Sequence, residues 1–387
     1  MTDRAALEAA LAAGIINADQ IGPLQEFLNQ QAAKPTVEGE EDLRFIRNFH
    51  DVFLAIGILL FAVGLGVAIA TQVATAPNPT QGAVLTGALT GGAAIVMWLL
   101  GEFFARRRRL FLPAIAIVCT LTVFGVISVA SLYFGLALGR GVTWTIDESH
   151  AMSPTFRNGF LLAAAIAVVA PALFYARFRL PFSLGMTGGC AALFVIFASL
   201  IFNWETALRY LPALYLALGI LLFLAGVAFD TRDPERATRL SDNGFWLHFA
   251  AAPLILNGTL GLIGQAMSAG KTTMLSPAAG MLAGGANNAT QAGATLIAVI
   301  VLGLVSLLIN RRALIVSALL TTGVAIGVLL SAVGLGAGAL GAATLITLGA
   351  FVLILGASWH VVRRALLGWV KPTGAWARIF PPEPSTA

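Results

Sequence analysis

Charged side chains are scarce in this sequence of 387 residues, where they make up only 11% of the chain. Soluble domains contain roughly 25% charged residues. Hydrophobic residues account for 58% of the chain and the mean hydropathy is +0.88, which is more apolar surface than a water-soluble fold of this size can bury. The composition therefore excludes an ordinary soluble domain.

Cysteine is also nearly absent, with only Cys119 and Cys190 in the chain. Both fall inside apolar stretches, so we interpret them as small packing residues and expect neither a disulfide nor a zinc site. The first twenty residues lack a continuous apolar core and contain Asp3, Glu8 and Asp19. We therefore expect no cleavable signal peptide, and the first apolar helix would serve as the targeting signal.

Long apolar runs, in contrast, fill the chain between residues 50 and 362. A helix needs about 20 apolar residues to cross a bilayer, and helices satisfy all their backbone hydrogen bonds internally. We predict an all-α, polytopic transmembrane bundle over residues 50–362, with a cytoplasmic or interfacial helical segment over residues 1–49 and a cytoplasmic tail over residues 363–387. The ten predicted spans are 51–73, 81–104, 111–134, 158–175, 181–201, 208–229, 244–267, 290–308, 313–333 and 337–360.

Lysine and arginine are distributed unevenly over the connections between these spans. Nineteen of the 23 fall on one side of the predicted membrane, and the other side carries Arg140, Arg157, Arg209 and Lys271. Because basic residues near spans are retained in the cytoplasm, both termini are predicted to be cytoplasmic. The net charge of +5 is then a topology signal, and nucleic acid is not an expected partner.

A run of four arginines connects the second and third predicted spans. Such a cluster is typical of any cytoplasmic loop of a membrane protein. It is also a candidate site for anionic lipid, at most about 1 kcal/mol per basic residue. The four residues are Arg106, Arg107, Arg108 and Arg109. The lipid bilayer itself is the one partner that the composition requires.

The segment before the first span is predicted to form two short amphipathic helices and a linker. Leu7, Leu11 and Ile15 keep helical spacing, Gly14 is a candidate helix breaker, and residues 21–28 carry a second apolar set. The segment is too short to bury a substantial core alone. We expect it to pack on the membrane domain or on a cytoplasmic protein partner.

Two stretches within the first 75 residues carry a family resemblance. They are LAAGIINADQI at residues 11–21 and LAIGILLFAVG at residues 54–64. With them the chain resembles a family of uncharacterised bacterial multi-pass membrane proteins, a domain of unknown function whose members carry a short cytoplasmic helical hairpin ahead of many spans. The resemblance implies this architecture and a location in the bacterial inner membrane, and it assigns no catalytic or binding residue.

The first and sixth predicted spans begin with similar sequences. FLAIGILLFAVG at residues 53–64 and YLALGILLFLAG at residues 215–226 are identical at eight of twelve positions. Two halves of five spans each would enter the membrane from opposite sides, as in the inverted repeats of many secondary transporters. The alternative is a chance match between helices rich in Leu, Ala and Gly, because later spans align only at a different offset.

The seventh predicted span carries the polar residues that could line a binding site. Pro253, Asn257 and Gln265 share one helix face, with His248 and Thr259 on an adjacent face. Proline frees a backbone carbonyl, and amide side chains inside a bilayer must face protein or a cavity. We predict these five as ligand-binding residues. The alternative is hydrogen bonding between helices.

Acidic residues are absent from the interior of every predicted span. Asp51 and Glu102 lie within about a turn of cytoplasmic ends, and Glu205 lies at an outer end. Because proton-coupled carriers commonly place an ionisable residue inside the membrane, this absence argues against a carboxylate-driven proton pump. It leaves sodium coordination by carbonyls and amides, facilitated movement, or no transport.

The sequence offers no catalytic arrangement on one membrane face, so we expect neither an enzyme nor a cofactor. Asp147, Glu148 and His150 share an outer loop, but their spacing matches no structural metal site. Two functions remain. One is a small-solute carrier or permease, which ten spans and an apparent half-repeat favour. The other is a non-transporting scaffold or sensor, acting through its N-terminal helices on a protein partner or as a homo-oligomer.

Overall fold

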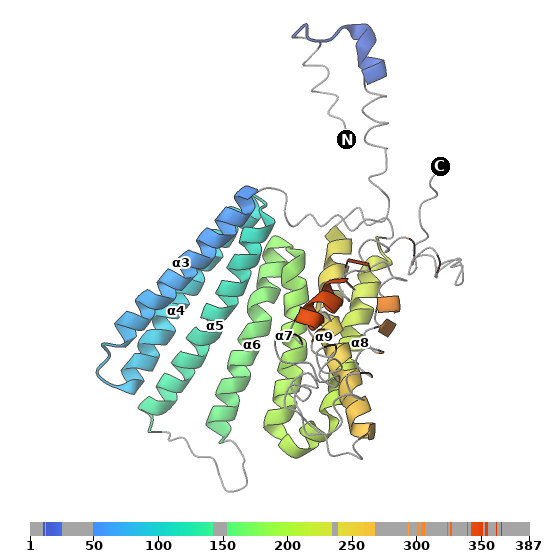
Figure 1. The fold of residues 1–387 in the computed structure, drawn as a ribbon. Helices are drawn as coiled ribbons and strands as arrows, with labels where there is room; N and C mark the ends of the chain where they lie inside the picture. The colour runs from blue at the N-terminus through green and yellow to red at the C-terminus, as the bar shows by residue number, and fades with distance from the viewer. Residues whose placement is uncertain are drawn as a thin grey trace. The chain divides into compact units, whose positions relative to one another are not determined.

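A computed structural model describes residues 11, 13–24, 49–141, 153–233 and 239–267, and scattered residues between 293 and 365. The chain divides into two units, Met1–Asp42 with Glu383–Ala387, and Leu43–Pro382. Every regular element among the described residues is a helix (Figure 1).

In the first unit, residues 18–24 are helical, and a turn precedes them. The backbone N–H of Asn17 donates to Oε1 of Gln20 at 2.9 Å, which is one half of a capping box. Gly14 has a φ of +66°, and its N–H donates to the carbonyl of Leu11 at 3.0 Å. This left-handed turn confirms Gly14 as a break in the helical pattern. Leu7 and residues 25–28 lie outside the described residues.

Seven helices of the second unit are long and apolar enough to cross a bilayer. The first seven predicted spans are thus confirmed as helices, and the described chain is a multi-pass membrane domain. Of the predicted spans at 290–308, 313–333 and 337–360 the structure describes only separate stretches, all helical, of which residues 342–350 are the longest. The elements are α3 (Phe49–Val73), α4 (Pro79–Gly101), the π-helix η1 (Glu102–Arg107), α5 (Phe111–Gly139), α6 (Pro154–Phe178), α7 (Pro181–Phe202), α8 (Trp204–Asp230) and α9 (Arg239–Met267).

Polar residues and prolines start several of these helices earlier than hydropathy predicts. Prolines occupy the first turn of α4 and α6, where a missing N–H breaks no helical hydrogen bond. Helix α7 also begins with a proline, at residue 181 as predicted. The side-chain oxygen of Asn78 accepts from the N–H of Gln81 at 2.8 Å and caps α4, and Asn203 caps α8 through Thr206 at 3.2 Å. These capped first turns are polar, so a hydropathy window leaves them out of the span.

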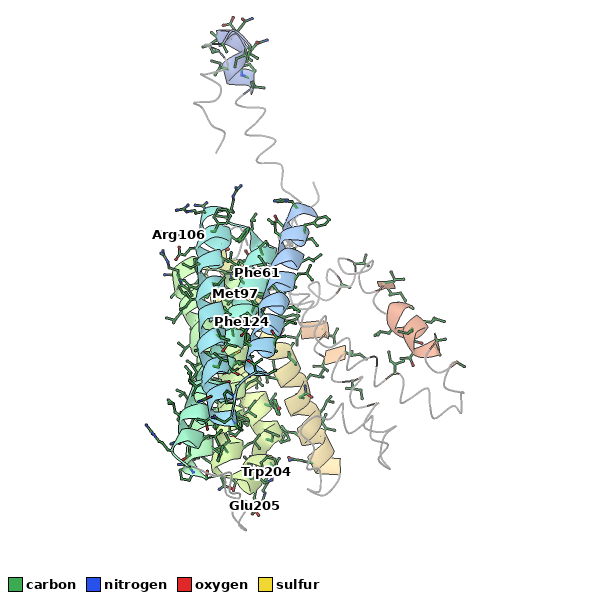
Figure 2. All side chains as sticks on the ribbon, turned by 90° about the vertical axis from the view of Figure 1, so that its left-hand side faces the viewer. Phe61, Met97, Arg106, Phe124, Trp204 and Glu205 are labelled. Atoms are coloured by element: carbon green, nitrogen blue, oxygen red, sulfur yellow. The ribbon has the colours of Figure 1, made fainter. Side chains whose placement is uncertain are left out.

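The helices form a row in which each packs mainly on its neighbours (Figure 1). At one side α3 lies against α4 and α5, and α4 packs along α5. Next come α6 and then α7, which contacts both α8 and α9. Consecutive helices run in opposite directions, so the α4–α5 and α6–α7 turns lie at the same end. Figure 2 shows Arg106 at that end and Trp204 and Glu205 at the other.

Arginine is concentrated at the end that carries the α4–α5 turn. It holds Arg106–Arg109, Arg177, Arg179 and Arg232, whereas the opposite end holds Arg140, Arg157 and Arg209. The helices therefore separate the basic residues as the sequence analysis expects. The cytoplasmic assignment of the first end stays a prediction.

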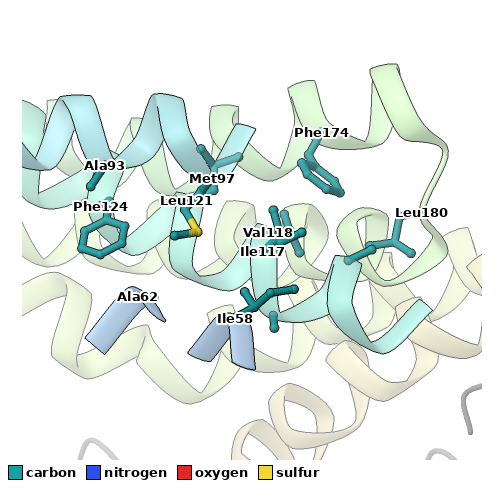
Figure 3. Close-up of a cluster of buried hydrophobic side chains, with 12 residues drawn as sticks. Ile58, Ala62, Ala93, Met97, Ile117, Val118, Leu121, Phe124, Phe174 and Leu180 are labelled. Atoms are coloured by element: carbon teal, nitrogen blue, oxygen red, sulfur yellow. The ribbon is translucent and has the colours of Figure 1, made fainter. Parts of the chain in front are cut away.

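Buried apolar side chains join the helices in two clusters. In the larger one, Met97, Ile117 and Phe174 from α4, α5 and α6 are all 0% exposed, and Ile58 and Ala62 add α3 (Figure 3). A smaller cluster joins α7, α8 and α9 through Ala192, Ile196, Leu211 and Leu254. Each half of the row thus has its own apolar centre.

Glycines set the distance between α4 and α5. A Cβ on Gly87 would lie 2.9 Å from the backbone nitrogen of Leu132, and one on Gly135 would lie 3.0 Å from the nitrogen of Val84. Side chains cannot be fitted at such distances without a shift of the backbone. Since lipid gives no hydrophobic drive between helices, close packing of this kind is a main attraction that holds them together.

The similar starts of α3 and α8 pack differently. Gly219 of α8 lies against α9, where an added Cβ would meet the backbone nitrogen of Ile255 at 2.8 Å. The aligned Gly57 of α3 has no described atom within 4 Å of an added Cβ, and Gly64 has none either. The sequence match therefore does not extend to helix packing among the described residues, and the inverted repeat stays a prediction.

Gly87→Ala is expected to lower the stability of the protein by about 1–3 kcal/mol, because the added Cβ forces α4 and α5 apart. Gly92→Ala is a matched control in the same helix, since no described atom lies within 4 Å of its Cβ. Thermal unfolding of the purified protein in detergent micelles measures both variants. Equal unfolding midpoints for the two would contradict the role assigned to Gly87.

Candidate functional site

Helices α8 and α9 form an antiparallel hairpin with a constant register. A Cβ on Gly219 would meet Ile255 near the middle of the hairpin. Towards one end, the side-chain amide of Gln265 donates to the backbone carbonyl of Arg209 at 2.9 Å. Arg209 lies ten residues before Gly219, and Gln265 lies ten residues after Ile255. The register of the two antiparallel helices is therefore unchanged over this length.

At the other end of the hairpin, Asp230 and His248 form a buried pair. Nε2 of His248 lies 3.1 Å from Oδ2 of Asp230, and His248 is 0% exposed. Each residue lies opposite a glycine of the partner helix. A Cβ on Gly226 would reach within 2.8 Å of the His248 ring, and one on Gly244 would run into the Asp230 carboxylate.

The two antiparallel helices therefore share one arrangement, a glycine followed one turn later by a buried ionisable residue. Gly226 lies one turn before Asp230 in α8, and Gly244 lies one turn before His248 in α9. In each case the missing side chain of the glycine makes the space that the ionisable group of the other helix fills. The hairpin can bury a carboxylate and an imidazole only because both glycines are present.

The imidazole of His248 is open to hydrogen bonding at one atom. The Phe223 ring meets it edge-on, with 4.9 Å between centroids. Nδ1 of His248 is buried and has no hydrogen-bond partner among the described residues. When Nε2 carries the proton and donates to Asp230, Nδ1 offers a lone pair, and when both nitrogens are protonated it offers an N–H. Nδ1 is therefore the atom at which a proton or a donor group can be added.

More buried polar groups lie close by along the same two helix ends. We define the polar cluster as Asp230, Asp233, Ser241, Asn243 and His248, all less than a tenth exposed. Nδ2 of Asn243 donates to the hydroxyl of Tyr175 at 2.9 Å, which ties α9 to α6. The cluster is thus linked to a third helix, at the end of the row that carries most of the arginines.

The five predicted site residues do not converge on one point. Nδ2 of Asn257 donates to the carbonyl of Pro253, one turn back in the same helix, at 2.8 Å. Pro253 itself is exposed and Thr259 is half-buried, and Gln265 bonds to the backbone of α8. Only His248 belongs to the polar cluster. The bond made by Gln265 is the interhelical kind weighed as the alternative.

Pro253 does not interrupt α9, which runs as one helix from Arg239 to Met267. A proline removes one N–H and crowds the preceding turn. Here the ring points away from the bundle, and the Asn257 amide adds a hydrogen bond to the carbonyl of Pro253. The helix accommodates the residue without opening.

Asp230 is the residue that sequence reasoning misses. The sixth span is predicted to end at residue 229, which leaves this carboxylate outside, whereas α8 includes it and its exposure is only 6%. The signal in the sequence is a glycine one turn before an ionisable residue, repeated in two consecutive spans. The absence of acidic residues from the predicted spans therefore has an exception in the buried Asp230 at the end of α8.

No family model matches the sequence, and no curated protein or solved structure matches it either. The family resemblance of residues 11–21 and 54–64 stays a prediction. The candidate site therefore depends on its own geometry alone.

Removing one member of the Asp230–His248 pair is expected to cost about 3–5 kcal/mol, because a buried contact between a carboxylate and an imidazole is lost. The single variants are Asp230→Ala and His248→Ala. The double variant should lose less stability than the two single losses added together, since both depend on one contact. Equilibrium unfolding in mixed micelles measures all three. Additive losses would show that the two side chains act independently.

Proposed function

We propose that the protein is a small-solute carrier or permease of the bacterial inner membrane, with the α8–α9 hairpin as its responsive element. The observation that supports the proposal is the Asp230–His248 pair, buried between two membrane-length helices. Ionisable groups in membrane helices are costly, and they are found mostly where they bind substrates, ions or protons.

The chemistry of this pair suits coupling to a proton. An imidazole that shares a hydrogen bond with a carboxylate can carry a proton on either ring nitrogen, so the pair can accept a proton or pass it on. Gain or loss of a proton by either group changes the net charge at the 3.1 Å contact between α8 and α9. The balance of attraction between the two helices would change with it.

We place the path of the solute along α9, beside the residues predicted from the sequence. The register of the hairpin puts Asn257 level with residue 217, which is the midpoint of α8. Its half-buried amide is thus a polar group near the middle of this hairpin, about two and a half turns from His248. The solute would bind near Asn257, and the pair would respond at the end of the hairpin.

With Cys119 and Cys190 replaced by alanine, a cysteine at Asn257 is expected to react with a membrane-impermeant thiol reagent from one side of oriented vesicles. The reason is that a solute path brings water to the middle of the membrane. The mass shift of the labelled protein measures the reaction.

Two further cysteines control this labelling experiment. A cysteine at Leu256, whose native side chain is 1% exposed, should stay unreacted, and one at Trp204, 56% exposed at the end of α8, should react. Protection of the Asn257 position from both sides would contradict the carrier and favour a dry packed bundle.

A scaffold or sensor is the second candidate, and one observation favours it. Residues Met1–Asp42 belong to a unit that separates by contacts from Leu43–Pro382, and its helix at residues 18–24 has a cap of its own. Under this alternative, deletion of residues 1–40 abolishes binding of the cytoplasmic protein partner, and a cysteine at Asn257 stays unreactive. Under the carrier proposal, the deletion leaves that labelling unchanged.

A further inference from the structure

A surface hollow lies at the end of α4, where the helix passes into η1. Its volume is about 620 Å³, and its lining residues are Leu99, Glu102, Phe103, Arg106 and Arg107. From this geometry we infer that the hollow binds an anionic membrane lipid, with the phosphate headgroup on Arg106 and Arg107. The inference is independent of the proposed transport function.

The lining changes from apolar to basic along the helix. Leu99 is 60% exposed and Phe103 is 42% exposed, so both present apolar surface to the surroundings of the bundle. Arg106 and Arg107 follow within two turns, about 12 Å from Leu99 along the axis. A lipid has the same order of groups, with its acyl chain in the hydrocarbon and its phosphate at the interface.

The charge in the hollow is positive although it contains an acid. Glu102 accepts hydrogen bonds from Arg177 at 2.7 and 3.2 Å and from Arg106 at 3.3 Å. One carboxylate thus faces two guanidinium groups, and the contact with Arg177 anchors it to the end of α6. Arg107 makes no ion pair within the part of the chain that the structure describes. Guanidinium groups bind phosphate oxygens through paired N–H donors.

The other two arginines of the run are placed differently. Arg108 lies over the Phe103 ring, with 5.6 Å to the centroid. Arg109 has a φ of 54° in the turn to α5, and neither residue lines the hollow. The N–H of Arg108 donates to the carbonyl of Phe103 at 3.1 Å, and this π-helical hydrogen bond closes the end of η1. Only two of the four arginines therefore line the hollow. If the run only fixed the orientation of the protein in the membrane, its arginines would not need to differ in this way.

The apolar half of the hollow favours a lipid over a free phosphate ion. Inorganic phosphate would gain nothing from contact with Leu99 and Phe103, whereas an acyl chain covers both. The two sources share the phosphate group, so an experiment must separate them.

Native mass spectrometry of the full-length protein in micelles tests this inference, with phosphatidylglycerol and phosphatidylcholine added as competing lipids. The wild-type protein is expected to retain phosphatidylglycerol in preference. The Arg106→Gln/Arg107→Gln variant should retain it about tenfold more weakly. The Arg108→Gln/Arg109→Gln variant removes the same charge from the same run and should retain it like the wild type.

Three results would overturn the inference. They are equal retention of the two lipids, equal loss in the two double variants, and displacement of phosphatidylglycerol by excess inorganic phosphate.

Arg107→Gln alone keeps the contacts of Glu102 with Arg106 and Arg177, so it tests the site without disturbing the link to α6. It is expected to weaken retention several-fold, and unchanged retention would overturn the inference as well.

Discussion

The described bundle depends on backbones that approach each other at glycine. Apolar side chains gain nothing from leaving lipid, so membrane helices hold together through close van der Waals contact and hydrogen bonds between helices. Gly87 and Gly135 supply that contact between α4 and α5, and Gly219 supplies it between α8 and α9. Both hairpins keep a fixed register because the backbone of one helix lies against the glycine of the other.

The same contact explains how charge can be buried here. Asp230 and His248 each fill the space left by a glycine, so the helices enclose the pair without moving apart. Both side chains are buried, and a low local dielectric strengthens the hydrogen bond between them and raises the cost of breaking it. The link from Asn243 to Tyr175 extends this polar contact to α6. At this end of the bundle, the close approach of the helices at glycine and the burial of the polar groups therefore depend on each other.

Much of the membrane fold follows from the sequence, since helix length and apolar composition are local properties. Seven predicted spans appear as helices in the expected places, and Gly14 breaks the N-terminal pattern as predicted. Spacing along one helix could not reveal the partners across helices. Asn257 and Gln265 share a face of α9, yet one bonds within its own helix and the other to α8.

Asp230 shows the same limit at a helix end. Hydropathy places a charged residue outside the span, and only the register of the hairpin brings it next to His248. The matched starts of α3 and α8 show the reverse case, because nearly the same residues lie in different surroundings. Local sequence determines the helix, and the glycine contacts along it determine what the helix meets.

The row of helices has a mechanical consequence. One apolar cluster joins α3, α4, α5 and α6, and another joins α7, α8 and α9. Within each block the glycine contacts resist sliding, because a shift along the axis would drive side chains into backbone. The two blocks are therefore stiff, and we expect bending to concentrate where α6 meets α7. The hydrogen bond from Asn243 of α9 to Tyr175 of α6 would then link the two blocks across this joint.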